Sequence, residues 1–225
     1  MNIQYHSIGG RHLIVIDDAF TSDELKFITD TVDAISESLW QEGHDDNLLR
    51  YSGIHELNVI NGTDDPNSVI KGDCVFLNAL GAPHKKICSI VDNVVYSAFS
   101  TKSIVTSEDR ERIFFDKNEF FCRVLRYMPG YYDQCADDDL FLHTDISTGV
   151  MFTPFENTID HQCTYYYEDD KFETPVLTLE HKPGRLVVFD GRIVHAPNRC
   201  DNSTRYAMSM HNDHDLQKYL GAFSE

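Results

Sequence analysis

The segment LFLHTDIS, residues 140–147, places His143 and Asp145 two positions apart. In a β-strand, side chains two positions apart point to the same face of the sheet, so this spacing can direct an imidazole and a carboxylate at one metal ion. The same pair also occurs in ordinary polar turns, and a reactive site needs a third ligand from elsewhere in the chain. His143 and Asp145 are therefore the first candidates for metal ligands.

A second histidine, His195, stands far downstream in the segment PGRLVVFDGRIVHAPNRC, residues 183–200. The chain between the two histidines is long enough for several strands to fold back and bring them together inside a barrel. Two histidines and one carboxylate on one face of a metal leave the other coordination positions open, which is the ligand set of the non-haem Fe(II) oxygenases. We predict that His143, Asp145 and His195 are the three metal ligands.

A rival cluster of ligand types lies in MHNDHD, residues 210–215, where His211 and Asp213 repeat the same spacing and His214 and Asp215 follow. Little chain remains after this cluster to fold around a metal ion. We interpret it as a polar strand end or the cap of a short C-terminal helix.

The spacing of apolar residues predicts mainly helices in the first half of the chain and mainly strands in the second half. Residues 12–20 predict a short strand, and apolar spacing over 21–39 and 84–100 predicts two amphipathic helices, the first capped by Thr21 or Ser22. Residues 41–72 are rich in Gly, Asn and Asp and predict an irregular connection. Alternating apolar residues then predict a hairpin over 112–130, strands within 149–155, 163–169, 175–181, 185–191 and 204–212, and a short helix over 214–222.

Helices first and strands afterwards indicate a mainly β architecture of the α+β class, in which the helices brace one face of an antiparallel sandwich. The chain of 225 residues is long enough for one well-buried core. We therefore expect a single domain over 1–225, with a helical N-terminal part over about 1–112 and a β core over about 113–212.

The composition narrows the classes of partner. The net charge is −18, with 37 acidic against 19 basic residues, so the average field repels nucleic-acid phosphates and anionic membranes. The six cysteines are scattered and form no short motif, which favours a reduced compartment. No leader-like start or long apolar run is present. We expect a cytoplasmic protein with no nucleic-acid or membrane partner; the oligomeric state has no signature in the sequence.

The order and spacing of these motifs resemble the Fe(II)/2-oxoglutarate-dependent dioxygenases, and within them the prolyl-4-hydroxylase-like group. The family pattern is H-x-D, a distal His, and an Arg or Lys about ten residues later, where this chain has Arg205. RYAMS then supplies Ser209, and LRYMPGYY (125–132) resembles the family's strand and turn in which a tyrosine, here Tyr127, reaches the same co-substrate. The resemblance implies a double-stranded β-helix (jelly-roll) core with N-terminal helices bracing one sheet.

The resemblance also implies the cofactors. Fe(II) is held by His143, Asp145 and His195, 2-oxoglutarate chelates it through the keto oxygen and C1 carboxylate, and O2 takes the remaining position. Arg205, with Tyr127 and Ser209, binds the C5 carboxylate. The implied reaction hydroxylates an unactivated C–H bond, releases succinate and CO2, and is supported by ascorbate.

The substrate implied is peptidyl proline, a free amino acid or a small metabolite. Retention of Asp145 favours hydroxylation, because related halogenases have a small residue there. The segment 146–162 is longer than the family pattern, and His211 stands where some relatives have a bulky aromatic residue.

Two other functions stay open. The first is a catalytically silent, cupin-like jelly roll that binds a ligand or partner. The second, an oxidative nucleic-acid demethylase, requires a basic face and a second arginine six residues after the first, at the position that His211 occupies.

Overall fold

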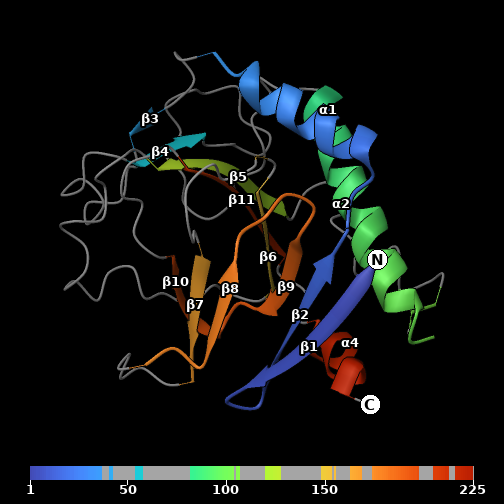
Figure 1. The fold of residues 1–225 in the computed structure, drawn as a ribbon. Coiled ribbons are helices and arrows are strands. Elements are labelled where there is room, and N and C mark those ends of the chain that lie inside the picture. Colours follow the sequence, from blue (N-terminus) through green and yellow to red (C-terminus); the bar gives the residue numbers. More distant parts are fainter. Residues whose placement is uncertain are drawn as a thin grey trace.

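Two antiparallel sheets and two long helices form the described part of the chain (Figure 1). The computed structural model describes residues 1–36, 41–42, 54–57, 82–103, 105–106, 120–127, 148–153, 155, 163–168, 174–197, 205–212 and 216–224, with only the backbone given at some strand positions. The larger sheet has the strand order β1-β2-β9-β6-β11-β5-β4-β3, and the smaller sheet has the order β10-β7-β8.

The strands are β1 (Asn2–Ile8), β2 (Arg11–Asp17), β3 (Gln41–Glu42), β4 (Ile54–Leu57), β5 (Phe120–Tyr127), β6 (Thr148–Phe152), β7 (Cys163–Tyr167), β8 (Leu177–Glu180), β9 (Leu186–Asp190), β10 (Val194–Pro197) and β11 (Arg205–Asn212). The helices are α1 (Ser22–Asp33), α2 (Ala82–Ser100), α4 (Gln217–Gly221) and the 3-10 turn η5 (Ala222–Ser224).

Helix α1 begins where the sequence predicts. Thr21 is its N-cap: the Thr21 hydroxyl accepts a hydrogen bond from the Glu24 amide at 3.3 Å, and the Glu24 carboxylate accepts one from the Thr21 amide at 2.9 Å. This reciprocal pair satisfies two amide donors that the first helical turn leaves open. The helix ends at Asp33, earlier than the predicted residue 39.

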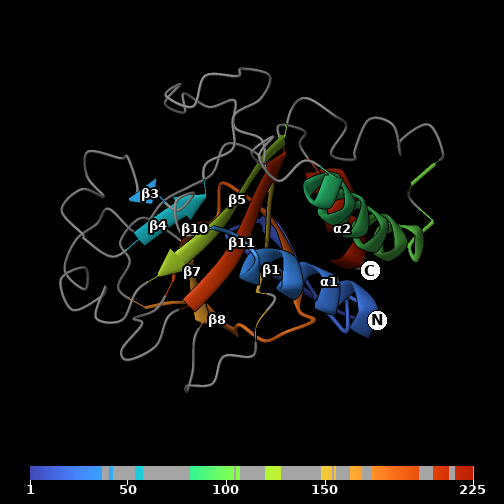
Figure 2. The ribbon, with the colours of Figure 1, turned by 90° about the horizontal axis from the view of Figure 1, so that it is seen from above.

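Helices α1 and α2 cover one face of the larger sheet (Figures 1 and 2). Alternate residues of the central strands point to them, so that Ile14, Val150, Val188 and Met208 are all buried with the apolar stripes of the two helices. Burial of this face explains why the strands are apolar at these alternate positions. The predicted bracing of one sheet by N-terminal helices is confirmed.

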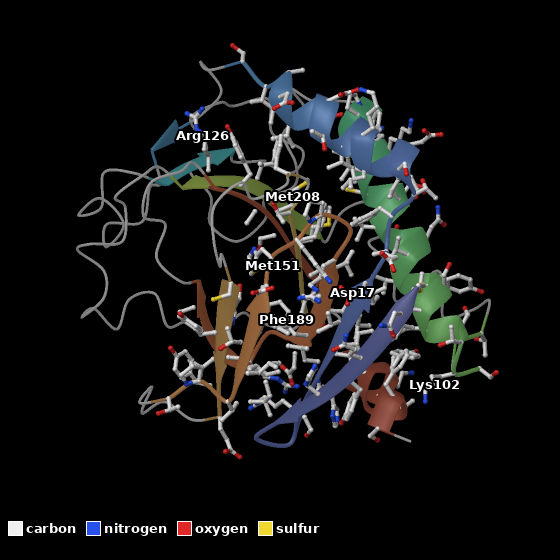
Figure 3. All side chains as sticks on the ribbon, viewed as in Figure 1. Asp17, Lys102, Arg126, Met151, Phe189 and Met208 are labelled. Atoms are coloured by element: carbon white, nitrogen blue, oxygen red, sulfur yellow. The ribbon has the colours of Figure 1, made fainter. Side chains whose placement is uncertain are left out.

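The opposite face of the larger sheet meets the smaller sheet, and we call it the inner face. Leu13, Val15, Val187 and Phe189 project from it and are buried with Tyr166 and Leu179 of β7 and β8. Figure 3 labels Phe189 among the side chains of this face. The larger sheet is therefore covered on both sides, which accounts for the fully buried stretch of β9.

The N-terminal segment contributes strands as well as helices. β1 and β2 form a hairpin at one edge of the larger sheet, and β3 and β4 lie at the other edge. The sequence did not predict β1 or β10, and β3 and β4 lie in the stretch that was predicted to be irregular.

The end of β2 is held by an ion pair. Asp17 accepts hydrogen bonds from Arg185 Nε at 2.7 Å and Nη2 at 3.1 Å.

Most predicted strands are confirmed with small shifts at their ends. β6, β7, β8, β9 and β11 overlap the five predicted runs, and α4 lies within the predicted C-terminal helix. β5 is the second half of the predicted hairpin, whose first half lies outside the described residues. In the described part of the chain, no helix is both long enough and apolar enough to cross a membrane.

Candidate active site

His195 lies in β10 of the smaller sheet, opposite Tyr166 of β7, and is 1% exposed. Its Nδ1 is 2.9 Å from the backbone carbonyl oxygen of Ile193. A carbonyl can only accept a hydrogen bond, so Nδ1 carries the proton and Nε2 carries the lone pair. This is the arrangement in which a histidine ligates a metal through Nε2 while its other nitrogen is held by a backbone partner.

The turn before β10 fixes the carbonyl that holds His195. Asp190 is fully buried and accepts hydrogen bonds from Arg192 Nε at 2.8 Å, the Arg192 amide at 2.9 Å and Arg11 Nη1 at 3.2 Å. Burial by itself raises the pKa of the Asp190 carboxyl, but these hydrogen bonds outweigh it and hold the pKa below its ordinary value. The Ile193 amide donates to the Asp190 carbonyl at 2.9 Å, which completes the turn.

Two aromatic rings hold the His195 imidazole from different sides. The Tyr166 ring is nearly parallel to it, with 6.0 Å between centroids and 27° between planes. The Phe189 ring meets it edge-on, with 4.9 Å between centroids and 75° between planes. Both rings are buried between the sheets, so His195 lies in the same layer as the inner face.

The strand register places Ser209, one of the predicted co-substrate residues, on the inner face. Ser209, which is 4% exposed, lies opposite Met151, and Met151 lies opposite Val187. Because Val187 packs between the two sheets, Ser209 shares that face. Position 205 is four residues earlier in β11 and has the same parity, and it lies opposite Tyr127 of β5.

Comparison with known proteins rests on structure alone, because no family model and no curated protein matches the sequence. A prolyl hydroxylase from Trichoplax adhaerens, solved in complex with a hypoxia inducible factor oxygen degradation domain peptide fragment, is 14% identical, with a TM-score of 0.53 over 95% of this chain and 87% of that chain. A prolyl-4-hydroxylase from Pseudomonas putida is also 14% identical, with a TM-score of 0.53 over 88% of this chain and 90% of that chain.

The chain shares the fold of these two prolyl hydroxylases. The same fold is found in the non-heme alpha ketoglutarate dependent epimerase SnoN from nogalamycin biosynthesis, which is 8% identical and has a TM-score of 0.51 over 88% of this chain and 76% of that chain. Because one fold serves enzymes with different reactions, the reaction must be argued from the residues of the site.

A pocket lies between β6 and β9 of the larger sheet and β7 and β8 of the smaller one. It is partly open to solvent, and Tyr166, whose ring also lies beside that of His195, forms part of its wall. The lining residues are Met151, Phe152, Thr153, Thr164, Tyr166, Leu179, Glu180, His181, Lys182, Arg185 and Val187. The pocket therefore adjoins the His195 site.

Polar groups of this pocket are candidates that the sequence analysis missed. The Thr153 hydroxyl is buried and makes no hydrogen bond within the described part of the chain, whereas Thr164 Oγ1 lies 2.6 Å from His181 Nε2. A polar residue at an inward position of the strand after the H-x-D motif is a signal for such a site, but the sequence does not tell which face of the strand is inward.

The remaining predicted residues are placed only in part. His143 and Asp145 lie outside the described residues, as do the side chains of Arg205 and Tyr127. Among the described side chains, no group of three or more His, Cys, Asp or Glu residues forms a metal-binding cluster. His211, from the rival cluster, lies in β11 opposite Gly149 of β6, and Asp213, His214 and Asp215 lie outside the described residues.

Proposed function

We propose that the chain is an Fe(II)- and 2-oxoglutarate-dependent oxygenase that hydroxylates an unactivated C–H bond. The observation that carries this proposal is the state of His195, a buried imidazole whose Nδ1 is bonded to the Ile193 carbonyl, the arrangement in which the Nε2 of a histidine ligates a metal.

In this proposal His143, Asp145 and His195 hold the iron, which supplies the activation of O2 when bound. The donor set of two imidazoles and a carboxylate suits Fe(II) and leaves open positions for a co-substrate. Tyr166 and Phe189 keep the His195 imidazole in one orientation and surround it with apolar surface. The Asp190 turn holds the Ile193 carbonyl that fixes the tautomer.

The co-substrate is placed by residues of the inner face. Arg205 offers a planar guanidinium fork to the C5 carboxylate of 2-oxoglutarate, with Tyr127 beside it across the strand pair and Ser209 on the same face. Thr153 lines the pocket that Tyr166 also lines, and its buried hydroxyl is available to donate to that carboxylate. We further propose that the two sheets are the two halves of a jelly roll, with this site between them.

The substrate class proposed is a peptidyl proline, a free amino acid or a small metabolite. The Trichoplax relative was solved with a peptide fragment, which supports a peptide as one candidate substrate. O2 is the co-oxidant of the proposed reaction, succinate and CO2 are its products, and ascorbate supports turnover.

Succinate release tests the proposal against a silent binding protein. The parent chain is incubated with Fe(II), ascorbate, 2-oxoglutarate and air, with pools of candidate peptides and amino acids that are followed by mass spectrometry for the gain of one oxygen. We expect succinate from the parent and background levels from His195→Ala. His12→Ala is the matched control, because His12 is bonded to Tyr5 in the β1–β2 hairpin; equal loss in both variants, or no succinate from the parent with any pool, contradicts the proposal.

A further inference from the structure

Gly149 and Phe189 face each other in the larger sheet, where Gly149 of β6 lies opposite Phe189 of β9. A Cβ atom built on Gly149 would lie 2.4 Å from Phe189 Cζ, 2.7 Å from Cε1 and 2.9 Å from Cε2. These separations are shorter than any that carbon atoms adopt in a packed core. The Phe189 ring therefore occupies the space that any side chain at position 149 would need.

The Phe189 ring has few directions in which to yield. It is 1% exposed, its edge contacts the imidazole of His195 at 4.9 Å between centroids, and it meets Tyr166 at 5.7 Å. A displacement away from the backbone of β6 moves the ring toward the smaller sheet, where His195 and Tyr166 lie. A side chain at position 149 would therefore displace the Phe189 ring, and that ring would in turn displace the His195 imidazole that it contacts.

We propose that Gly149 and Phe189 act as a positioning pair that sets the tilt of the His195 imidazole. The Ile193 carbonyl holds one ring nitrogen of His195. The Phe189 and Tyr166 rings pack beside the imidazole and limit its rotation, so that Nε2 points in one direction. Gly149 is required because only the absence of a side chain lets Phe189 lie deep enough to touch His195 without displacing it.

This inference rests on the proposed role of His195 as a metal ligand and assigns no contact with metal or substrate to either residue of the pair. Gly149 follows Asp145 by four positions in the sequence, so the pair also links the strand after the H-x-D motif to the distal histidine. A change at position 149 is expected to alter metal affinity without removing a ligand.

Metal affinity and folding stability can be measured separately to test the pair. The probe is Mn(II) alone, titrated under anaerobic conditions and followed by its electron paramagnetic resonance signal, with Co(II) absorption as a reporter of ligand geometry. We expect Gly149→Ala to weaken Mn(II) binding about tenfold or more, the scale of outer-shell changes around metal ligands, and to change the Co(II) spectrum. Phe189→Leu removes the aromatic ring that contacts His195 but creates no clash, so it should weaken Mn(II) binding less than Gly149→Ala does.

The double variant tests whether the two residues act through their contact with each other. Gly149→Ala combined with Phe189→Leu should bind Mn(II) more tightly than Gly149→Ala alone, because the shorter side chain makes room for the new methyl group. Val150→Ala is the matched control: Val150 is the next residue in β6 and faces the helices, so it should lower the melting temperature and leave Mn(II) affinity within about twofold.

Several results would contradict the positioning role of Gly149 and Phe189 or the function on which it rests. If Gly149→Ala and Phe189→Leu both bind Mn(II) like the parent, or if the double variant shows no recovery, the positioning role is wrong. If Gly149→Ala does not fold, Phe189→Leu alone decides, with parent-like affinity and spectrum counting against the pair. Failure of the proposed function looks different, because the parent then binds no Mn(II) that depends on His195.

Discussion

Arg205 lies directly opposite Tyr127 in the antiparallel pairing of β11 with β5. Residues paired in this way have their Cα atoms about 4.5–5.5 Å apart and share one face of the sheet. The two residues were predicted separately, from motifs far apart in the sequence, to reach the same carboxylate. Their register makes that shared role geometrically consistent and leads to the first prediction.

Arg205→Ala should weaken 2-oxoglutarate binding while leaving metal affinity unchanged. A charge-assisted hydrogen bond contributes about 1.5–3 kcal/mol, so its loss corresponds to a decrease of about ten- to several-hundred-fold when the carboxylate is left desolvated. Arg205→Lys should be intermediate, because lysine keeps the charge and loses the fork. Calorimetric titration of 2-oxoglutarate into Mn(II)-loaded protein measures the effect.

The control for the loss of one positive charge is Lys26→Ala, on the exposed surface of α1, where Lys26 pairs only with Asp30 among the described residues. It should leave 2-oxoglutarate affinity unchanged. Parent-like affinity in Arg205→Ala would remove that residue from the co-substrate site and strengthen the silent jelly-roll alternative.

Thr153→Val should have effects of opposite sign on stability and on co-substrate binding. The Thr153 hydroxyl is buried and makes no hydrogen bond within the described chain, so replacing it with a methyl group should leave the free energy of unfolding unchanged or increase it. If the hydroxyl donates to the 2-oxoglutarate carboxylate, affinity should fall about ten- to a hundredfold. Urea unfolding and calorimetry measure the two quantities.

Thr164→Val is the contrasting variant in the same pocket. The Thr164 hydroxyl is bonded to His181 at 2.6 Å, so this change should lower the free energy of unfolding by about 1 kcal/mol. A loss of stability in Thr153→Val with no change in 2-oxoglutarate affinity would show that Thr153 has a structural role only.

Asp190→Asn should make folding less stable at neutral pH and less sensitive to acid. The pKa of Asp190 is lowered in the folded protein, so its ionised form contributes stability that is present above the unfolded pKa of about 3.9 and is lost as pH falls through the folded value. We expect a loss of about 1–3 kcal/mol at pH 7, shrinking below pH 4. Urea unfolding at both pH values measures this.

Asp30→Asn provides the comparison, because Asp30 forms an exposed i,i+4 pair with Lys26 and such pairs contribute little. It should change the unfolding free energy by less than about 0.5 kcal/mol. Equal pH dependence in Asp190→Asn and the parent would mean that the buried carboxylate does not stabilise the turn that holds His195.

Asp145→Gly should abolish hydroxylation even where chloride or an added carboxylate partly restores metal binding. The reason is that the variant lacks the proposed carboxylate ligand, at the position where related halogenases have a small residue. The measurement is the gain of one oxygen by the substrate, together with bound iron per chain. A variant that hydroxylates at the parent rate would exclude Asp145 from the ligand set.

The sequence predicts the central strands because they are short, largely apolar runs. Side chains of β6, β9 and β11 point alternately to the helices and to the smaller sheet. Because both faces are buried, the sequence does not show which face is inward. The inner position of Ser209 became clear only from its register with Met151 and Val187.

The missed features have different physical causes. β1 is an edge strand in which only Ile8 is buried, so its half-buried apolar residues Ile3 and Tyr5 give a weak signal, and β10 is four residues long, too short to show a period. The buried hydroxyl of Thr153 and the fit of Phe189 against Gly149 depend on neighbours brought together by the fold. Such contacts between strands have no signal within either strand.

The measurement that tests the central claim most directly is an anaerobic titration of 2-oxoglutarate into the Fe(II)-loaded chain, followed by the visible absorption that a 2-oxo acid gives when it chelates Fe(II). We expect the parent to develop this absorption and to saturate at one 2-oxoglutarate per chain, and we expect His195→Ala, loaded under the same conditions, not to develop it. A His195→Ala variant that develops the same absorption with the same 2-oxoglutarate affinity, or a parent chain that develops none, contradicts the proposed metal and co-substrate site.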